Sequence, residues 1–141
     1  MKRNNFIFVF VALLAFCLIG CATNTPESDT EDVNAAIREE ISEWPDNEYT
    51  KVILKPDVGE MDYTLSDENA GYYAVFLKNV TMEDGKQYIQ LLKENGFESV
   101  SSDSNSVAIG EILKKGTIGL SVSASENVLA LYITLNAEEA Q

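Results

Sequence analysis

The sequence predicts an α+β domain, namely an antiparallel sheet of five or six strands with one principal helix packed on one face. Residues 117–124 alternate aliphatic with small polar side chains, as the residues of a half-buried strand do. Several similar segments are separated by short turns, which predicts antiparallel pairing of neighbours. One segment with helical spacing and two marked ends interrupts the series.

The helix is the best-marked element of the sequence. Thr81 is suited to be its N-cap, and Asp84, three residues on, completes a capping pair. Gly96 and Phe97 have the order of a Schellman C-terminus, in which Phe97 folds back over the helix. Gly85 lies on the apolar face, where it permits close approach to the sheet. The predicted buried stripe consists of Tyr88, Ile89 and Leu92.

The remaining strands follow from alternation and from turn residues. In residues 72–80, one face carries Tyr73, Val75 and Leu77 and the other carries Tyr72, Ala74 and Phe76, which predicts a central strand. An earlier strand is expected to place Met61, Tyr63 and Leu65 on one face. The other predicted elements are an edge strand or extended arm at 51–54, an entry into the sheet at 97–101, a polar loop at 101–106, a strand from Val107 to Leu113 with Gly110 as a candidate bulge, and a final strand at 128–135.

The N-terminal third of the chain divides into three predicted parts. Residues 1–20 are a signal peptide, 21–32 an acidic flexible tether and 33–44 a short amphipathic helix. Pro45 ends that helix, and Trp44 is expected to dock on the core. The α+β domain then spans 45–136, and residues 137–141 form an acidic tail.

Residues 1–20 carry the pattern of a cleaved bacterial signal. Lys2 and Arg3 precede an apolar run from Phe6 to Ile19, which is short for a membrane-spanning helix. The run ends in Leu18-Ile19-Gly20-Cys21, which has the form of a lipobox, whereas Cys17 lies inside the apolar run. An uncleaved transmembrane anchor and an ordinary secretory signal are the alternatives.

The lipobox resembles that of bacterial lipoproteins, and this resemblance implies lipidation of Cys21. In that family the thiol receives a diacylglycerol, the signal is cut before the Cys, and a third acyl chain is added in some members. The chain from Trp44 to Leu135 is also similar to a domain of unknown function in small Gram-positive lipoproteins. The similarity rests on Trp44-Pro45, Lys55-Pro56, a strand after Gly59, the Gly96-Phe97 helix end and a closing meander. It implies a lipid-anchored location on the outer face of the cell membrane and carries over no catalytic or binding residue.

The charge and composition of the chain limit the classes of partner and of chemistry to be expected. The chain has 23 acidic and 10 basic residues and no His. Loss of Lys2 and Arg3 with the signal leaves 8 basic residues and a net charge of −15 (8 minus 23). Such a surface repels nucleic acid and favours a cationic partner, or it simply keeps the domain soluble. Without His, and with Cys21 as the only Cys after cleavage, disulfides, zinc sites and Cys or His catalysis are not expected.

No catalytic, cofactor or metal residue is predicted, although several candidates are present. Asp57, Glu60 and Asp62 form an acidic cluster, and the segments that begin at Asp67 and Asp103 have the oxygen spacing of half a calcium loop. Solvent-exposed turns explain the acidic segments better than calcium sites do. A carboxylate pair for glycoside hydrolysis is a minor alternative. Two further features have structural explanations: Ser123 and Ser125 are expected at the surface, and the sequon Asn79-Val80-Thr81 is better explained by the cap.

The tyrosines are the last candidates for residues of a binding site. Tyr63, Tyr72, Tyr73, Tyr88 and Tyr132 are expected to be mainly core, with Tyr72 as the one exposed for recognition. The sequence thus favours a non-enzymatic, lipid-anchored module. It is expected to bind an unidentified envelope protein or ligand through the sheet face opposite the helix or an edge strand. The alternative is a structural or accessory subunit without a ligand site.

Overall fold

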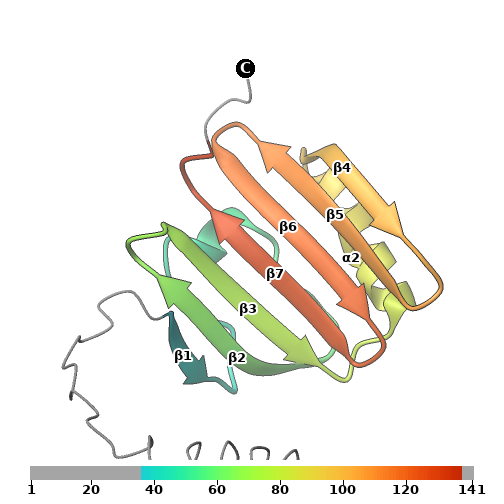
Figure 1. Ribbon diagram of the computed structural model, residues 1–141, viewed down its shortest axis with the longest axis horizontal. Coiled ribbons are helices and arrows are strands. Elements are labelled where there is room, and N and C mark those ends of the chain that lie inside the picture. The colour runs from blue at the N-terminus through green and yellow to red at the C-terminus, as the bar shows by residue number, and fades with distance from the viewer. Residues whose placement is uncertain (1–35, 138–141) are drawn as a thin grey trace, which may run out of the picture. The chain divides into compact units, whose positions relative to one another are not determined.

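The protein folds as one seven-stranded antiparallel sheet with one α-helix on one face. The computed structural model describes residues 36–137. The strands lie in the order β1-β2-β3-β7-β6-β5-β4 (Figure 1). Their bounds are β1 Ile37–Glu40, β2 Glu60–Asp67, β3 Tyr72–Lys78, β4 Glu98–Ser104, β5 Ala108–Lys115, β6 Ile118–Ser125 and β7 Val128–Thr134, and the helix α2 spans Met82–Glu94. The α+β class is confirmed, but the expected five or six strands are too few.

Of the two strands at the edges of the sheet, β1 was not expected from the sequence, and β4 extends beyond the segment 97–101 that was expected to enter the sheet. Residues 37–40, predicted within the helix at 33–44, form β1 and pair with residues 63–66 of β2. The polar loop predicted at 101–106 lies mostly within β4, which pairs with β5. Every residue of both strands is solvent-exposed. Neither face of these two strands is buried, so their side chains need not alternate between apolar and polar.

Two irregularities in pairing change which side chains share a face. The register of β2 shifts between Met61 and Tyr63, so Met61 packs with the core whereas Tyr63 faces away from it. The expectation that these two side chains share one face is therefore wrong. The second shift lies between Ser99 and Ser101 of β4, and the ladder of β5 with β6 runs without a shift past Gly110. Gly110 is therefore not the bulge.

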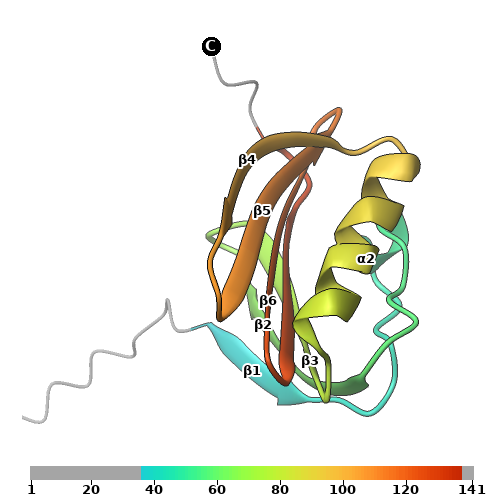
Figure 2. The same cartoon turned by 90° about the vertical axis from the view of Figure 1, so that its right-hand side faces the viewer.

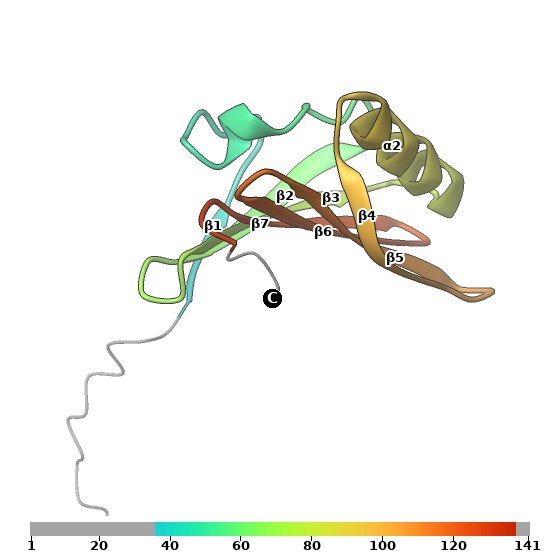
Figure 3. The same cartoon turned by 90° about the horizontal axis from the view of Figure 1, so that it is seen from above.

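The helix face of the sheet is covered by two separate segments. Helix α2 packs on β5 and β6, and residues 41–59 lie on the same side of the sheet (Figures 2 and 3). Residues 51–54, expected as a strand or arm, instead contain a 3-10 turn, η1 (Thr50–Val52). The hydroxyl of Tyr88 on α2 donates to the carbonyl of Leu54 at 2.6 Å and joins the two covers. Trp44 packs against the core, as predicted.

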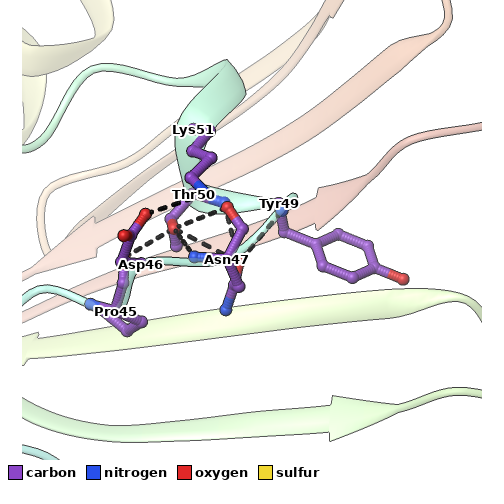
Figure 4. A network of polar contacts seen from close by, with 6 residues as sticks. All are labelled: Pro45, Asp46, Asn47, Tyr49, Thr50 and Lys51. Atoms are coloured by element: carbon purple, nitrogen blue, oxygen red, sulfur yellow. Dashed lines mark hydrogen bonds and ion pairs between the residues drawn. The ribbon is translucent and has the colours of Figure 1, made fainter.

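A local network gives residues 45–51 their shape (Figure 4). Asn47 Oδ1 accepts hydrogen bonds from the backbone N–H groups of Tyr49 and Thr50, both at 3.0 Å. The buried hydroxyl of Thr50 donates to the carbonyl of Pro45 at 2.6 Å. The ring of Tyr49 then stacks on Tyr73 of β3, with centroids 5.7 Å apart. Polar groups in the turn are thus satisfied while its aromatic ring covers the sheet.

Both predicted ends of α2 are confirmed. Thr81 Oγ1 accepts from the N–H of Asp84 at 3.1 Å, and the Asp84 carboxylate accepts from the N–H of Thr81 at 2.9 Å. At the other end Phe97 N–H donates to the carbonyl of Leu92 at 3.1 Å, and Gly96 has φ of 91°. The predicted stripe of Tyr88, Ile89 and Leu92 is buried. Both caps use contacts within a few residues, which is why the sequence predicts them.

Gly85 marks the closest approach of α2 to the sheet. A Cβ at this position would collide with the Cβ of Ala124 on β6. Gly→Ala in an exposed helix gains about 1 kcal/mol, but overpacking a core costs about 1–3 kcal/mol. We expect Gly85→Ala to lower the free energy of unfolding, measured by urea denaturation. Adding Ala124→Gly should recover part of the loss.

Gly110→Ala is the matched control for this pair, because a Cβ there meets no atom within 4 Å. We expect it to change the free energy of unfolding much less than Gly85→Ala does. A stabilised Gly85→Ala variant would contradict the close contact between the helix and the sheet.

The capping carboxylate makes stability depend on pH. Hydrogen bonds from the backbone and hydroxyl of Thr81 hold the pKa of Asp84 below its usual range. Because the pKa is lower in the folded state, the stabilisation is present above the unfolded pKa of about 3.9 and is lost as pH falls through the folded pKa. We expect Asp84→Asn to flatten the decline of unfolding free energy between about pH 5 and 2. Glu83→Gln removes a charge from the same turn but outside the capping box, so the decline of unfolding free energy should stay as steep as in the wild type. Equal slopes for the two variants would contradict the attribution of the decline to Asp84.

Candidate binding surface

The sheet face opposite α2, here called the open face, is the surface that the two covering segments leave free. Figure 1 looks onto it, with α2 behind the strands, and Figure 2 shows the cover on one side only. Alternation along the interior strands sends Val75, Leu77 and Leu131 into the core. The same alternation, with the shift in β2, sends the side chains of Tyr63, Tyr72, Phe76 and Tyr132 to the open face.

The four rings form two stacked pairs across neighbouring strands. Tyr63 stacks on Phe76 with centroids 4.3 Å apart and planes 12° apart. Tyr72 stacks on Tyr132 with centroids 4.5 Å apart and planes 25° apart. The guanidinium of Arg38 on β1 lies over Tyr63, 3.4 Å from the ring centroid, and pairs with Glu40 at 2.8 Å. Stacked rings and a guanidinium over a ring face each add favourable contacts across strands.

The most exposed ring of the open face is Tyr132, with 41% of its surface exposed. The expectation that Tyr72 is the exposed tyrosine is wrong, because Tyr72 is only partly exposed beneath its stacking partner. Tyr73 and Tyr88 lie on the helix side, as expected of core residues. Burial raises the pKa of the Tyr132 phenol, and the nearby Tyr72 and Asp67 raise it further.

The other half of the open face carries small side chains. Strand β6 presents a row that consists of Gly119, Ser121, Ser123 and Ser125. A shallow hollow of about 280 Å³ lies beside this row, with Gly110, Ser121 and Ser123 in its lining. Ile112, which is 48% exposed, also lines this hollow. The open face therefore combines an aromatic half with a hollow of small residues.

Two further hollows lie outside the open face. An open groove of about 930 Å³ is lined by residues 41–44 and 55–61 and by Lys78. Its charged residues are of both signs and include Glu43, Lys55, Asp57 and Glu60. This mixture selects no single class of ligand.

The third hollow, of about 310 Å³, lies between α2 and β4 and holds an internal ion pair. Lys93 Nζ lies 2.6 Å from a buried oxygen of Glu111. Burial raises the pKa of Glu111, but hydrogen bonds from Lys93 and Ser99 outweigh it, so the pKa lies below its ordinary value. The pair satisfies its own charges within the fold.

The carboxylates singled out in the sequence do not gather in one cavity. Asp57 and Glu60 line the groove, Asp62 pairs with Lys78 at 3.6 Å, and Asp103 lies on edge strand β4. Asp67 Oδ1 accepts from the N–H groups that follow it in the turn, at 2.9 Å each. Within residues 36–137, no three His, Cys, Asp or Glu side chains are close enough to hold a metal ion.

The remaining positions singled out in the sequence either have the structural role expected of them or lie outside the described residues. Thr81 is the N-cap, Ser123 is exposed and Ser125 is partly exposed. Cys21, the signal peptide at 1–20 and the tether at 21–32 lie outside residues 36–137, as does most of the tail. In the part of the chain that is described, no helix is long and apolar enough to cross a membrane.

No family model, curated protein or solved structure matches this chain. The similarity to small Gram-positive lipoproteins stays a prediction. The residue of the open face that the sequence missed is Arg38, because a helix was expected there. The placement of Phe76 on one face with Tyr72 and Ala74 was predicted from their alternation and is confirmed.

Proposed function

We propose that the protein is a non-enzymatic, lipid-anchored module that is displayed outside the cell membrane and binds a component of the envelope through the open face. The observation that supports binding is the one-sided cover of the sheet. The open face keeps Tyr132 exposed and the other stacked rings partly exposed, whereas the helix face is covered along its width. Exposed aromatic clusters of this kind are typical of interaction surfaces.

The anchor is proposed from the signal pattern that ends at Cys21. Two acyl chains on one Cys give stable attachment, whereas one chain gives only weak attachment. Residues 22–36 separate Cys21 from β1, and 15 residues span at most about 50 Å when extended. The acidic excess of the chain disfavours adhesion to anionic lipid. An anchored domain of this charge is suited to meeting a partner away from the membrane surface.

The anchor is tested by replacing its Cys. We expect Cys21→Ser to abolish incorporation of labelled palmitate and to shift the protein out of the membrane fraction of the producing bacterium, because the thiol is the acceptor of the acyl chains. Cys17→Ser, which alters a thiol of the same segment, should leave both properties unchanged. Palmitate in Cys21→Ser would contradict the proposed anchor.

Binding through the open face is tested by site-specific cross-linking in intact cells. We place a photoreactive phenylalanine at Tyr132 on the open face or at Leu91, which is 40% exposed on α2. We expect a discrete cross-linked product from position 132 and none from position 91, since only the former lies on the proposed surface. No product at 132, or equal products at both positions, would contradict it.

A further inference from the structure

The two ring stacks of the open face differ in one respect. The stack of Tyr63 with Phe76 has the guanidinium of Arg38 over it, whereas in residues 36–137 no Lys or Arg lies over the stack of Tyr72 with Tyr132. Of the four rings in the two stacks, that of Tyr132 is the most exposed. A guanidinium over an aromatic ring is a favourable contact, and it is stronger when the cation is desolvated. The second stack has the same aromatic chemistry without the cation.

A carboxylate stands beside the second stack. Asp67 on β2 is the register partner of Tyr72 on β3, so both side chains lie next to each other on the open face. Its Oδ1 accepts from two backbone N–H groups of the β2–β3 turn, which holds the carboxylate in place. Burial raises the pKa of the Tyr132 phenol, and Tyr72 and the charge of Asp67 raise it further. A negative charge beside two stacked rings is suited to a cation.

The protein itself has few cations to place there. Of its basic residues, Arg38, Lys51, Lys78, Lys86 and Lys93 are in ion pairs within the described chain. Lys115 donates to the carbonyl of Asn95 at 2.7 Å, and Lys55 lines the groove outside the open face. Lys114 is on β5, two strands away from Tyr132 on β7. No Lys or Arg occurs from Cys21 up to Arg38, so the segment after the lipidation site brings none. Charge complementarity therefore points to a cation from a partner.

We propose that Tyr72, Tyr132 and Asp67 form a binding site for an arginine side chain of a basic protein segment. Arginine fits better than lysine, because its planar guanidinium stacks on a ring and can pair with a carboxylate at the same time. Exposed Ile112 and the hollow beside β6 extend the surface for the rest of the segment. This proposal rests on the proposed role of the open face in binding and specifies the class of partner.

The test uses residues 22–141, which contain the whole described core from Ile41 to Ile133. The probes are two synthetic hexapeptides, one alternating arginine with serine and one with lysine at each arginine position. NMR of ¹³C-labelled tyrosine rings reports binding. We expect saturable shifts at Tyr72 and Tyr132 with the arginine peptide and binding about fivefold weaker with the lysine peptide. Equal affinities, or shifts that do not saturate, would overturn the proposal.

The variants separate this site from general charge attraction. Asp67→Asn keeps an oxygen for the turn, and Tyr132→Leu keeps apolar area; each should weaken the arginine peptide about fivefold while the fluorescence of Trp44 confirms folding. Asp57→Asn removes the same charge from the groove outside the open face and should leave the affinity nearly unchanged. Equal losses of affinity for Asp67→Asn and Asp57→Asn would show that only net charge matters and would overturn the site.

The same variants distinguish failure of this inference from failure of the proposed function. If cross-linking at position 132 in cells persists in the Asp67→Asn background, the open face binds a partner but the arginine site is wrong. If Asp67→Asn and Tyr132→Leu both weaken the arginine peptide but no cross-linked partner forms in cells, the arginine site is upheld and the envelope-binding function fails.

Discussion

The architecture depends on covering one face of a seven-stranded sheet with two separate segments, which the hydrogen bond from the Tyr88 hydroxyl to the Leu54 carbonyl joins. A helix is about 10–12 Å wide and strands are about 4.8 Å apart, so one helix covers two or three of seven strands. Residues 41–59 must cover the remainder, and the network around Thr50 and the stack of Tyr49 on Tyr73 hold them there.

Both covers lie on one face, and this asymmetry leaves the open face to solvent. A face without a second layer is stabilised by contacts between its own side chains, which explains the cross-strand stacks and the guanidinium of Arg38 over Tyr63. Stacking leaves Tyr132 exposed at the same time. The contacts that stabilise the open face therefore also supply the candidate binding surface.

The sequence predicted those parts of the fold that depend on local contacts. The capping box of Thr81 with Asp84, the Schellman end at Phe97 and the close approach at Gly85 are confirmed, as are the two faces of β3. The failures lie where strand pairing and register, and not periodicity, decide the structure. The fully exposed strands β1 and β4 have no alternation to read, and the shift after Met61 reverses the face of Tyr63.

The sequence by itself determined the α+β class, the ends of α2 and the alternation of the central strands, since each follows from periodicity or from hydrogen bonds within a few residues. Only the tertiary structure decided which tyrosine is exposed, that Arg38 reaches Tyr63, and that Asp67 stands beside Tyr72. These facts depend on register and on stacking between strands, and a shift of one residue moves a side chain to the other face of the sheet.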